Sequence, residues 1–402
     1  MKVWNVCLLL VTAVFFVACE PDVVVEQTPV VETAVSPEQS PAAETVEIVR
    51  EVPVTVEVTR EVVVEHVVEV TPVPLGSPSR PVQLLFPPMQ ETAVIKNRST
   101  ALVNALQEAT GLSFEAGIVD SQQRLIELMC AAPQDTIGFM SAAAFVVAHE
   151  QCNVQTAVVS VGTDGLSWQT GMIVTRRGTG LTQLADLDGK IWGIPDTISI
   201  PNYHYIKAMF AEAGIEPAEE IIYPGDNSAL LALHNGEVDF VTATYIPPIM
   251  PNGEEWVYGE DAPDAWRRLG ISPTRSPIGY VLVLAEPEFG GYRLRDARSG
   301  IFDTTPEIYD ETFVVALSAQ IPRDTVAFGP DFPTALGRQI TAVLTEFGQS
   351  EACQASLCAS DFYGWAGVEP VTDSQYDPLR QMMSLLDWSA ADIWQNTDEN
   401  GQ

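Results

Sequence analysis

The stretch Leu184-Ala-Asp-Leu-Asp-Gly-Lys190, continued by Ile191-Trp-Gly-Ile-Pro-Asp196 and Ser199-Ile-Pro-Asn-Tyr203, predicts a strand, a loop and the start of a helix. An Asp-Gly-Lys turn leads into the apolar run, and an amphipathic pattern from Tyr203 ends at the C-cap residue Gly214. In such a unit the loop lies at the carboxyl end of a buried strand, where backbone N–H groups and the helix dipole can hold a small polar or anionic ligand. We therefore expect an α/β fold with a ligand site at this loop.

This stretch, together with the later FAEAGIEP and ALLALHNGEVDFVTATY, resembles the second lobe of the phosphate/phosphonate-type solute-binding proteins of ABC importers. Further segments resemble that family in the same order, and the resemblance covers roughly residues 81–388. These segments are residues 80–86 (opening strand), 87–91 (first ligand-facing loop), 135–148 (strand into helix), 168–176 (crossing strand), and 296–298, 313–322 and 376–380 (return strand and C-terminal helix).

The resemblance implies a two-lobed periplasmic binding protein fold of type II, in which two crossover strands join the lobes and a hinge closes them over a solute. Short apolar runs at residues 172–175 and 313–317 are the expected crossover strands. The expected division is a signal peptide (1–19), a disordered stalk (20–80), the first lobe (81–175 and 315–402) and the second lobe (176–314). Residues 246–300, rich in proline, glycine and tryptophan, are expected to elaborate the second lobe.

The function implied by the resemblance is that of an extracytoplasmic solute receptor of an ABC importer, working with a permease as a monomer. The alternative is a sensory or scaffolding envelope lipoprotein that uses the same fold without transport. No GxSxG elbow, HExxH helix, P-loop or GxGxxG motif occurs, so we expect no enzyme, no cofactor and no metal site. The net charge of −34 and the lack of a basic stripe argue against nucleic-acid binding.

The N-terminus resembles a bacterial lipoprotein signal. Lys2 provides the positive start, residues 6–17 an apolar core, and Phe16-Val-Ala-Cys19 a cleavage site ending in cysteine, although phenylalanine replaces the usual leucine. We expect lipidation at Cys19 and anchoring to the outer side of the cytoplasmic membrane. The alternative is a single membrane-spanning helix, for which the apolar stretch is marginal.

Residues 20–80 form a segment with twelve acidic residues, three arginines, repeated valines and frequent prolines. Like charges and the lack of aromatic residues favour an extended, self-repelling stalk. The alternative is a β-strand that pairs with a partner on contact, because valine and glutamate alternate with strand periodicity.

Four cysteines remain after the signal, namely Cys130, Cys152, Cys353 and Cys358, an even number suited to an oxidising compartment. Three pairings are possible, and neighbour spacing favours Cys130 with Cys152 and Cys353 with Cys358. A metal site is the alternative, but there is neither a CxxC pair nor a nearby histidine set to support it.

The candidate ligand-binding residues share a position at the carboxyl end of an expected strand or in the loop beyond it. They are Gln90, Ser141, Trp168, Ser199, Asn202, Tyr203, Asp239 and Tyr245. For several of them an alternative role is open: lobe packing for Trp168 and Tyr203, helix capping for Ser199 and Asn202, and a structural turn for Asp239.

The anion-binding loop of the family is where this sequence departs from the resemblance. Family members have a run of serine and threonine there, whereas Ile200 lacks a hydroxyl and Pro201 lacks an amide donor. Asp226 stands where relatives often have histidine. We therefore predict that the ligand is a neutral, zwitterionic or cationic organic molecule and not a phosphate-like dianion.

Overall fold

The computed structural model describes residues 12–13, 22–24, 56–58, 66–67, 72–284 and 291–393. The contacts divide the chain into two units, Met1–Val73 and Pro74–Gln402. The predicted cleavage site, Cys19 and most of the predicted stalk lie outside the described residues. In the first unit, β1 (Thr12–Ala13) pairs antiparallel with β4 (His66–Val67), and β2 (Asp22–Val24) with β3 (Val56–Val58). Across the described part of the chain, no helix has both the length and the apolar character needed to cross a bilayer.

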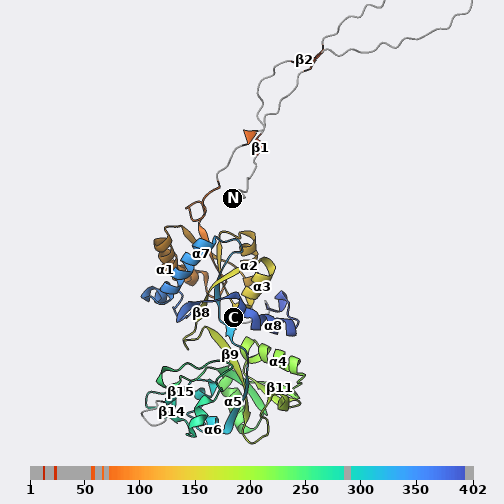
Figure 1. Cartoon of the computed structure of the whole chain (residues 1–402), viewed down its shortest axis with the longest axis vertical. Coiled ribbons are helices and arrows are strands. Elements are labelled where there is room, and N and C mark those ends of the chain that lie inside the picture. Colours follow the sequence, from red (N-terminus) through yellow and green to blue (C-terminus); the bar gives the residue numbers. More distant parts are fainter. Residues whose placement is uncertain are drawn as a thin grey trace, which may run out of the picture. The chain divides into compact units, whose positions relative to one another are not determined.

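The second unit contains two lobes, each built on a sheet flanked by helices (Figure 1), and this confirms the predicted α/β, two-lobed fold class. The first sheet has the strand order β19-β8-β18-β7-β5-β6. Its strands are β5 (Val82–Phe86), β6 (Phe114–Ile118), β7 (Thr136–Met140), β8 (Gln155–Val161), β18 (Thr325–Phe328) and β19 (Gly367–Pro370). β5 runs parallel to β6 and β7, whereas β18 is antiparallel to both of its neighbours, β7 and β8.

Helices cover both faces of this first sheet. α1 and α7 pack with one hydrophobic cluster, and α2, α3 and α8 pack with another on the opposite face, as Figure 1 shows. These helices are α1 (Thr92–Thr110), α2 (Gln122–Ala131), α3 (Ala142–Cys152), α7 (Thr334–Gly348) and α8 (Asp377–Leu385). Both faces of β5 and β7 are therefore largely buried, which explains why apolar residues predominate in them, with Gln83 and Thr136 as the polar exceptions.

The second sheet has the order β11-β10-β12-β9-β16, with β17 pairing on β9. Its elements are β9 (Trp168–Arg176), β10 (Ile191–Ile194), α4 (Tyr205–Ala213), β11 (Glu219–Ile222), α5 (Asp226–Asn235), β12 (Phe240–Tyr245), α6 (Ile308–Glu311), β16 (Thr312–Leu317) and β17 (Ile321–Pro322). The stretch that opens the sequence analysis forms β10 and α4 as predicted, and α4 ends at Gly214 in the left-handed conformation with φ of 67°.

Residues 246–300 carry a separate antiparallel sheet of β13 (Thr274–Arg275), β14 (Val281–Leu284) and β15 (Gly291–Leu294). Short helical turns complete the described elements. They are η1 (Leu184–Leu187), η2 (Ile200–His204), η3 (Pro251–Gly253), η4 (Ala265–Leu269), η6 (Ala297–Gly300), η7 (Glu351–Ala355) and η8 (Asp373–Tyr376).

The expected crossover strands at residues 172–175 and 313–317 lie inside β9 and β16, which pair with each other in the second sheet. The first residues of β9 pair instead with β17, since Trp168 lies opposite Pro322 and Gln169 opposite Ile321. The two antiparallel connections between the lobes therefore meet at this short ladder. The predicted lobe limits at 175/176 and 314/315 fall within β9 and β16.

Residues 74–80, assigned to the stalk from the sequence, contact the first lobe. Leu75 packs against its core, and Ser113 donates a backbone hydrogen bond to Gly76. Arg80 donates to both carboxylate oxygens of Asp135, from Nε to Oδ2 at 2.9 Å and from Nη2 to Oδ1 at 2.6 Å. The contacts place the start of the folded unit at Pro74 and not at residue 81.

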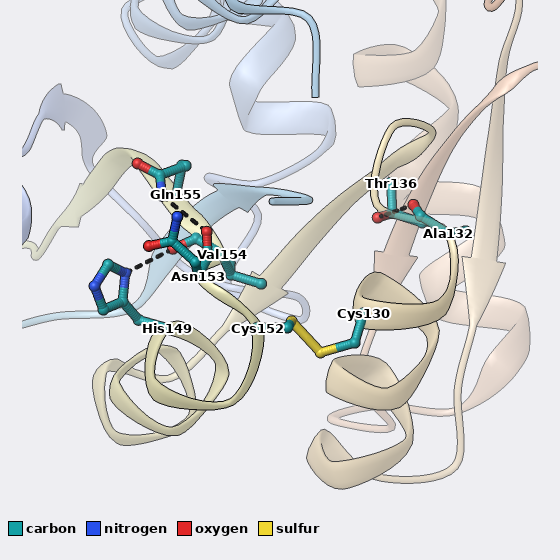
Figure 2. The surroundings of a disulfide bond; sticks show 8 residues. All are labelled: Cys130, Ala132, Thr136, His149, Cys152, Asn153, Val154 and Gln155. Carbon is teal, nitrogen blue, oxygen red and sulfur yellow. Dashed lines mark hydrogen bonds between the residues drawn. A yellow bond between two sulfur atoms is a disulfide. The ribbon is translucent and has the colours of Figure 1, made fainter. Parts of the chain in front are cut away.

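Both disulfides favoured by neighbour spacing are present, Cys130–Cys152 and Cys353–Cys358. The first joins the C-terminal ends of α2 and α3, as Figure 2 shows. Beside it, Nδ1 of His149 lies 3.0 Å from the carbonyl oxygen of Val154, which fixes the turn from α3 into β8. None of these four cysteines is available as a metal ligand.

A charged network lies inside the second lobe. Arg298 is completely buried and donates to Asp264 at 2.6 Å and to Asp296 at 2.9 Å. The Tyr309 hydroxyl donates to Oδ1 of Asp296 at 3.2 Å. The network ties η6 to η4 and α6, so the Asp296-Ala-Arg298 segment is part of the internal framework of this lobe.

Candidate functional site

A cavity of about 470 Å³ is lined by residues of both lobes. The first lobe contributes the start of α3 at Ser141, the end of β8 at Ser160, and the segments 321–324 and 363–365. The second lobe contributes the loop from Asp196 to Pro201. The cavity therefore lies where a two-lobed binding protein holds its solute.

A second, smaller pocket of about 230 Å³ lies on the other side of the hinge connections. Successive strand residues point to opposite faces, and the lining residues of β8 and β9 follow this alternation, whereas Pro322 lines both pockets. Ser160, Gln169 and Ile321 line the first cavity, whereas Val159, Trp168 and Gln320 line the second.

The start of α3 supplies hydrogen-bond donors on the first-lobe side. Ser141 is its N-cap, and Oγ of Ser141 accepts from the amide of Ala144 at 3.2 Å. Ala142 and Ala143, the next two residues, line the cavity. Amides in the first turn of a helix have no partner within the helix, so this end can hold a polar or anionic group.

Several amides of the opposing second-lobe segment, residues 196–204, donate hydrogen bonds within that segment. Oδ1 of Asp196 accepts from the Ile198 amide at 2.8 Å, and Oγ of Ser199 accepts from the Asn202 amide at 3.2 Å. The amides of Tyr203 and His204 donate to the carbonyl of Ser199. Pro201 has no amide hydrogen.

Gly171 of β9 allows this loop to lie against the second sheet. A Cβ at that position would lie 2.3 Å from the carbonyl oxygen of Pro201 and 2.8 Å from Oδ1 of Asn202. The Gly171 amide donates to Oγ of Ser318 at 2.8 Å. The position of the loop that carries Ser199 therefore depends on the missing side chain.

The cation that lines the cavity, Arg323, is neutralised by a neighbouring carboxylate. Its Nη2 donates to Oδ2 of Asp164 at 2.6 Å, and its Nε donates to the carbonyl of Leu166 at 3.0 Å. Gly162 permits this approach, since a Cβ there would lie 2.6 Å from the guanidinium carbon. The arginine thus braces the loop between β8 and β9 and carries little free charge for an anion.

Asp324, the next residue, lines the same cavity beside Tyr363 and Trp365. Burial raises the pKa of Asp324 to about 6, while the charge of Arg323 and a hydrogen bond from the Trp365 side chain act against the shift. The Tyr363 hydroxyl has no hydrogen-bond partner among the described residues. Burial, and then the Asp324 charge, raise the pKa of that hydroxyl.

Of the residues predicted to bind ligand, Ser141 and Ser199 meet at this cavity. Gln90 lines a separate pocket with Lys96 and Asp120, and Trp168 lines the pocket behind the hinge.

The other four predicted residues make internal contacts in the second lobe. Nδ2 of Asn202 donates to Thr244 at 3.1 Å, and the Tyr203 hydroxyl donates to Glu220 at 3.1 Å. Asp239 accepts from the Ile191 amide at 2.9 Å. Tyr245, 1% exposed, donates to the carbonyl of Pro263 at 3.0 Å.

Asp226, expected to repel anions at the loop, accepts instead from the Thr244 amide at 3.2 Å. Burial raises its pKa. It is absent from the cavity lining, so the carboxylates that face the solute space are Asp196 and Asp324.

The cavity is also lined by residues that were not predicted from the sequence, namely the polar pair Arg323-Asp324 and the aromatic residues Tyr363, Trp365 and Trp388. A signal for the pair was present, because it follows the return strand in the same way that Ser141 follows β7. No comparable signal marked the aromatic residues, which come from the loop before β19 and the segment after α8.

One group of potential metal ligands occurs among the described residues. His234, Glu307 and Glu311 place ligand atoms within 4.8 Å of one another on the second lobe. None of the three lines the cavity, and both glutamates are exposed.

Residues 84–376 match the sequence family described as "ABC transporter, phosphonate, periplasmic substrate-binding protein". No curated protein matches the chain in sequence.

Similar solved structures include a Xanthomonas citri protein bound to ATP, with 11% identity, a TM-score of 0.45, and coverage of 76% of this chain and 98% of that one. A binding-protein component of an ABC phosphonate transporter from Pseudomonas aeruginosa has 14% identity and a TM-score of 0.36, with coverage of 80% and 88%. PhnD1 from Prochlorococcus marinus in complex with methylphosphonate has 9% identity and a TM-score of 0.37, with coverage of 76% and 98%.

Proposed function

Because the chain belongs to the phosphonate family of periplasmic substrate-binding proteins of ABC transporters, we propose that it captures a small organic solute between its lobes and presents it to a permease. Members of this family are non-enzymatic transport components that work outside the cytoplasm. The observation that supports the proposal most directly is the cavity lined by residues of both lobes on one side of the hinge. Closure around such a cavity buries the solute and creates the surface that a permease can recognise.

The solute is not a phosphate-like dianion. In the second-lobe loop the Ile198 amide donates to Asp196 and the Asn202 amide donates to Ser199, and Pro201 has no amide hydrogen. On the first-lobe side, Arg323 is paired with Asp164. Each charged hydrogen bond that is lost weakens a dianion by roughly 1.5–3 kcal/mol, so two losses weaken binding by about 100-fold or more.

The protein acts at the membrane through a lipid on Cys19, and residues 20 onward lie outside the cytoplasm. This part of the proposal rests on the Phe16-Val-Ala-Cys19 pattern. Replacing Cys19 with serine is expected to release the protein from the membrane fraction. Retention of the variant in that fraction would mean that the N-terminal segment is held as a helix.

Mass spectrometry of small molecules released from the purified protein tests solute capture. A Thr163→Trp variant provides the control, because Thr163 is exposed and lines the cavity. We expect a molecule that co-purifies with the wild type and is lost from the variant, while both melt at the same temperature. If both proteins released equal amounts of the molecule, the solute would bind outside this cavity.

Titration calorimetry with phosphate, phosphite and methylphosphonate tests the ligand class. We expect no binding tighter than about 1 mM, which corresponds to about −4 kcal/mol. Micromolar binding of any of the three would return the protein to phosphonate capture.

A further inference from the structure

We propose that the solute carries a protonated amine and that Asp324 is the residue that binds it. This inference rests on the proposed function, since it concerns the same cavity. The structure favours it on three grounds, which are the charge of Asp324, whose neighbouring arginine is paired with another carboxylate, the groups around that carboxyl, and a second carboxylate from the opposite lobe.

The first ground is charge. Asp324 directly follows Arg323, yet the guanidinium donates to Asp164 and Leu166 from its Nη2 and Nε atoms. The side-chain hydrogen bond that reaches Asp324 comes from Trp365, a neutral donor. Asp324 is half-buried, and a carboxylate that is partly removed from water while its nearest cation is paired elsewhere is costly; an ammonium group of a ligand would relieve that cost.

The second ground is the immediate surroundings. Tyr363 lines the cavity, and its hydroxyl oxygen is buried without a partner among the described residues, so a small side-chain shift would let it accept a hydrogen bond from an ammonium N–H. Trp365 and Trp388 supply aromatic walls to the same cavity. Aromatic faces attract cations and cover the methylene groups of an alkyl amine.

The third ground is Asp196, which lines the cavity from the second lobe. The residues of the lining that carry a charge at neutral pH are Asp196, Arg323 and Asp324, and Asp164 already neutralises Arg323. The cavity therefore has an excess of negative charge contributed by both lobes. A cation stabilises the closed state by reducing repulsion between them.

Calorimetry with matched pairs of solutes tests the inference. The pairs are 4-aminobutyrate with 4-hydroxybutyrate, putrescine with 1,4-butanediol, and ethanolamine with ethylene glycol. At least one amine is expected to bind at least about 100-fold more tightly than its hydroxyl partner, because a charged hydrogen bond to a buried carboxylate is lost in the partner. Equal affinity within a binding pair, or the lack of any amine binding at about 10 mM, a concentration that detects even very weak complexes, overturns the proposal.

The Asp324→Asn variant separates a ligand-binding role from a structural one. Asparagine keeps the shape and still accepts from Trp365 but removes the buried charge, so the variant is expected to melt at the same temperature as the wild type or higher at neutral pH. Amine affinity is expected to fall by at least about 100-fold. A lower melting temperature together with unchanged affinity would show that Asp324 serves the fold alone.

Failure of this inference is distinguishable from failure of the proposed function. A neutral or acidic solute that binds the wild type, is blocked by Thr163→Trp and is unaffected by Asp324→Asn would refute the amine and keep the receptor. If neither Thr163→Trp nor Asp324→Asn reduced solute capture, both the amine inference and the proposed function would be refuted.

Discussion

At the scale of single residues, Asp324 makes affinity depend on pH. Its pKa of about 6 lies above the ordinary value of 3.8. Since an ammonium binds the ionised form, we expect amine affinity to fall about tenfold for each pH unit below about 6. Asp324→Asn is expected to give a flat profile in calorimetry between pH 5 and 8, and a flat wild-type profile would contradict the assignment.

The raised pKa of Asp324 also affects the free energy of unfolding, which changes with pH in the opposite direction to amine affinity. The folded protein holds the Asp324 proton more tightly than the unfolded chain, so the free energy of unfolding falls as pH rises from about 4 to about 6 and stays low above that range. The advantage of Asp324→Asn in melting temperature should therefore be present at neutral pH and vanish below about pH 4.

Arg298 shows the reverse situation, a buried cation with two carboxylate partners. Arg298→Met leaves Asp296 buried without its arginine partner and leaves Asp264 with Arg267 alone, and is expected to lower the free energy of unfolding by about 3–5 kcal/mol in urea titrations. The matched control is Arg275→Met, whose partner Asp303 is exposed, with an expected loss below about 1 kcal/mol. Similar losses for both variants would contradict this account.

At the scale of elements, Gly171 controls how closely η2 approaches the second sheet. Gly171→Ala introduces a Cβ 2.3 Å from the Pro201 carbonyl oxygen and is expected to lower the free energy of unfolding by about 1–3 kcal/mol. Solute affinity should fall as well, because the loop that carries Ser199 must move. Gly367→Ala in β19 is the control, since its nearest atom lies at 3.5 Å. If Gly171→Ala and Gly367→Ala unfolded at the same urea concentration, the close approach of η2 to Gly171 would be refuted.

The two disulfides should differ in their contribution. Cys130–Cys152 spans 22 residues and Cys353–Cys358 spans 5. On the chain-entropy estimate, replacing both cysteines of a pair with alanine costs about 3 kcal/mol for the first and about 2 kcal/mol for the second. Chemical unfolding of the two double variants measures the difference, and a larger loss for the shorter loop would contradict it.

Elements were predictable from the sequence where local pattern and tertiary position agree. The β10 strand and the α4 helix follow from the apolar run and from Gly214, because both signals are local. Strand ends also located Ser141 and Ser199. Sequence position could not show that Tyr245 turns into the core toward Pro263, or that Asp239 is used by the Ile191 amide, because these contacts depend on register between strands.

At the scale of the whole molecule, the start of the folded unit can be tested by truncation. A protein that begins at residue 74 keeps Leu75 and the Arg80–Asp135 pair, and its melting temperature should equal that of the longer chain. A protein that begins at residue 81 loses both and should melt several degrees lower, because about 1–2 kcal/mol corresponds to roughly 2–8 °C at this size. Equal melting of the two truncated proteins would show that residues 74–80 contribute nothing.

The overall division into two lobes was predicted from ordered resemblance, whereas the chemistry of the cavity was not. Its polar residues come from segments far apart in the chain, Asp196, Asp324 and Trp365 among them. These segments come together only because the chain passes from the first lobe to the second and back again. The sequence therefore predicted the two-lobed fold around the site more fully than the residues that line it.

The position of β18 between β7 and β8 has a consequence for biogenesis. A nascent polypeptide that has emerged as far as β17 already has every strand of the second sheet, whereas β7 and β8 still lack the strand that separates them. Their unpaired edges are open to intermolecular pairing until β18 has been synthesised. Asp324 and Trp365 arrive in this same final segment, so the chain acquires solute recognition in the step that also closes its aggregation-prone gap.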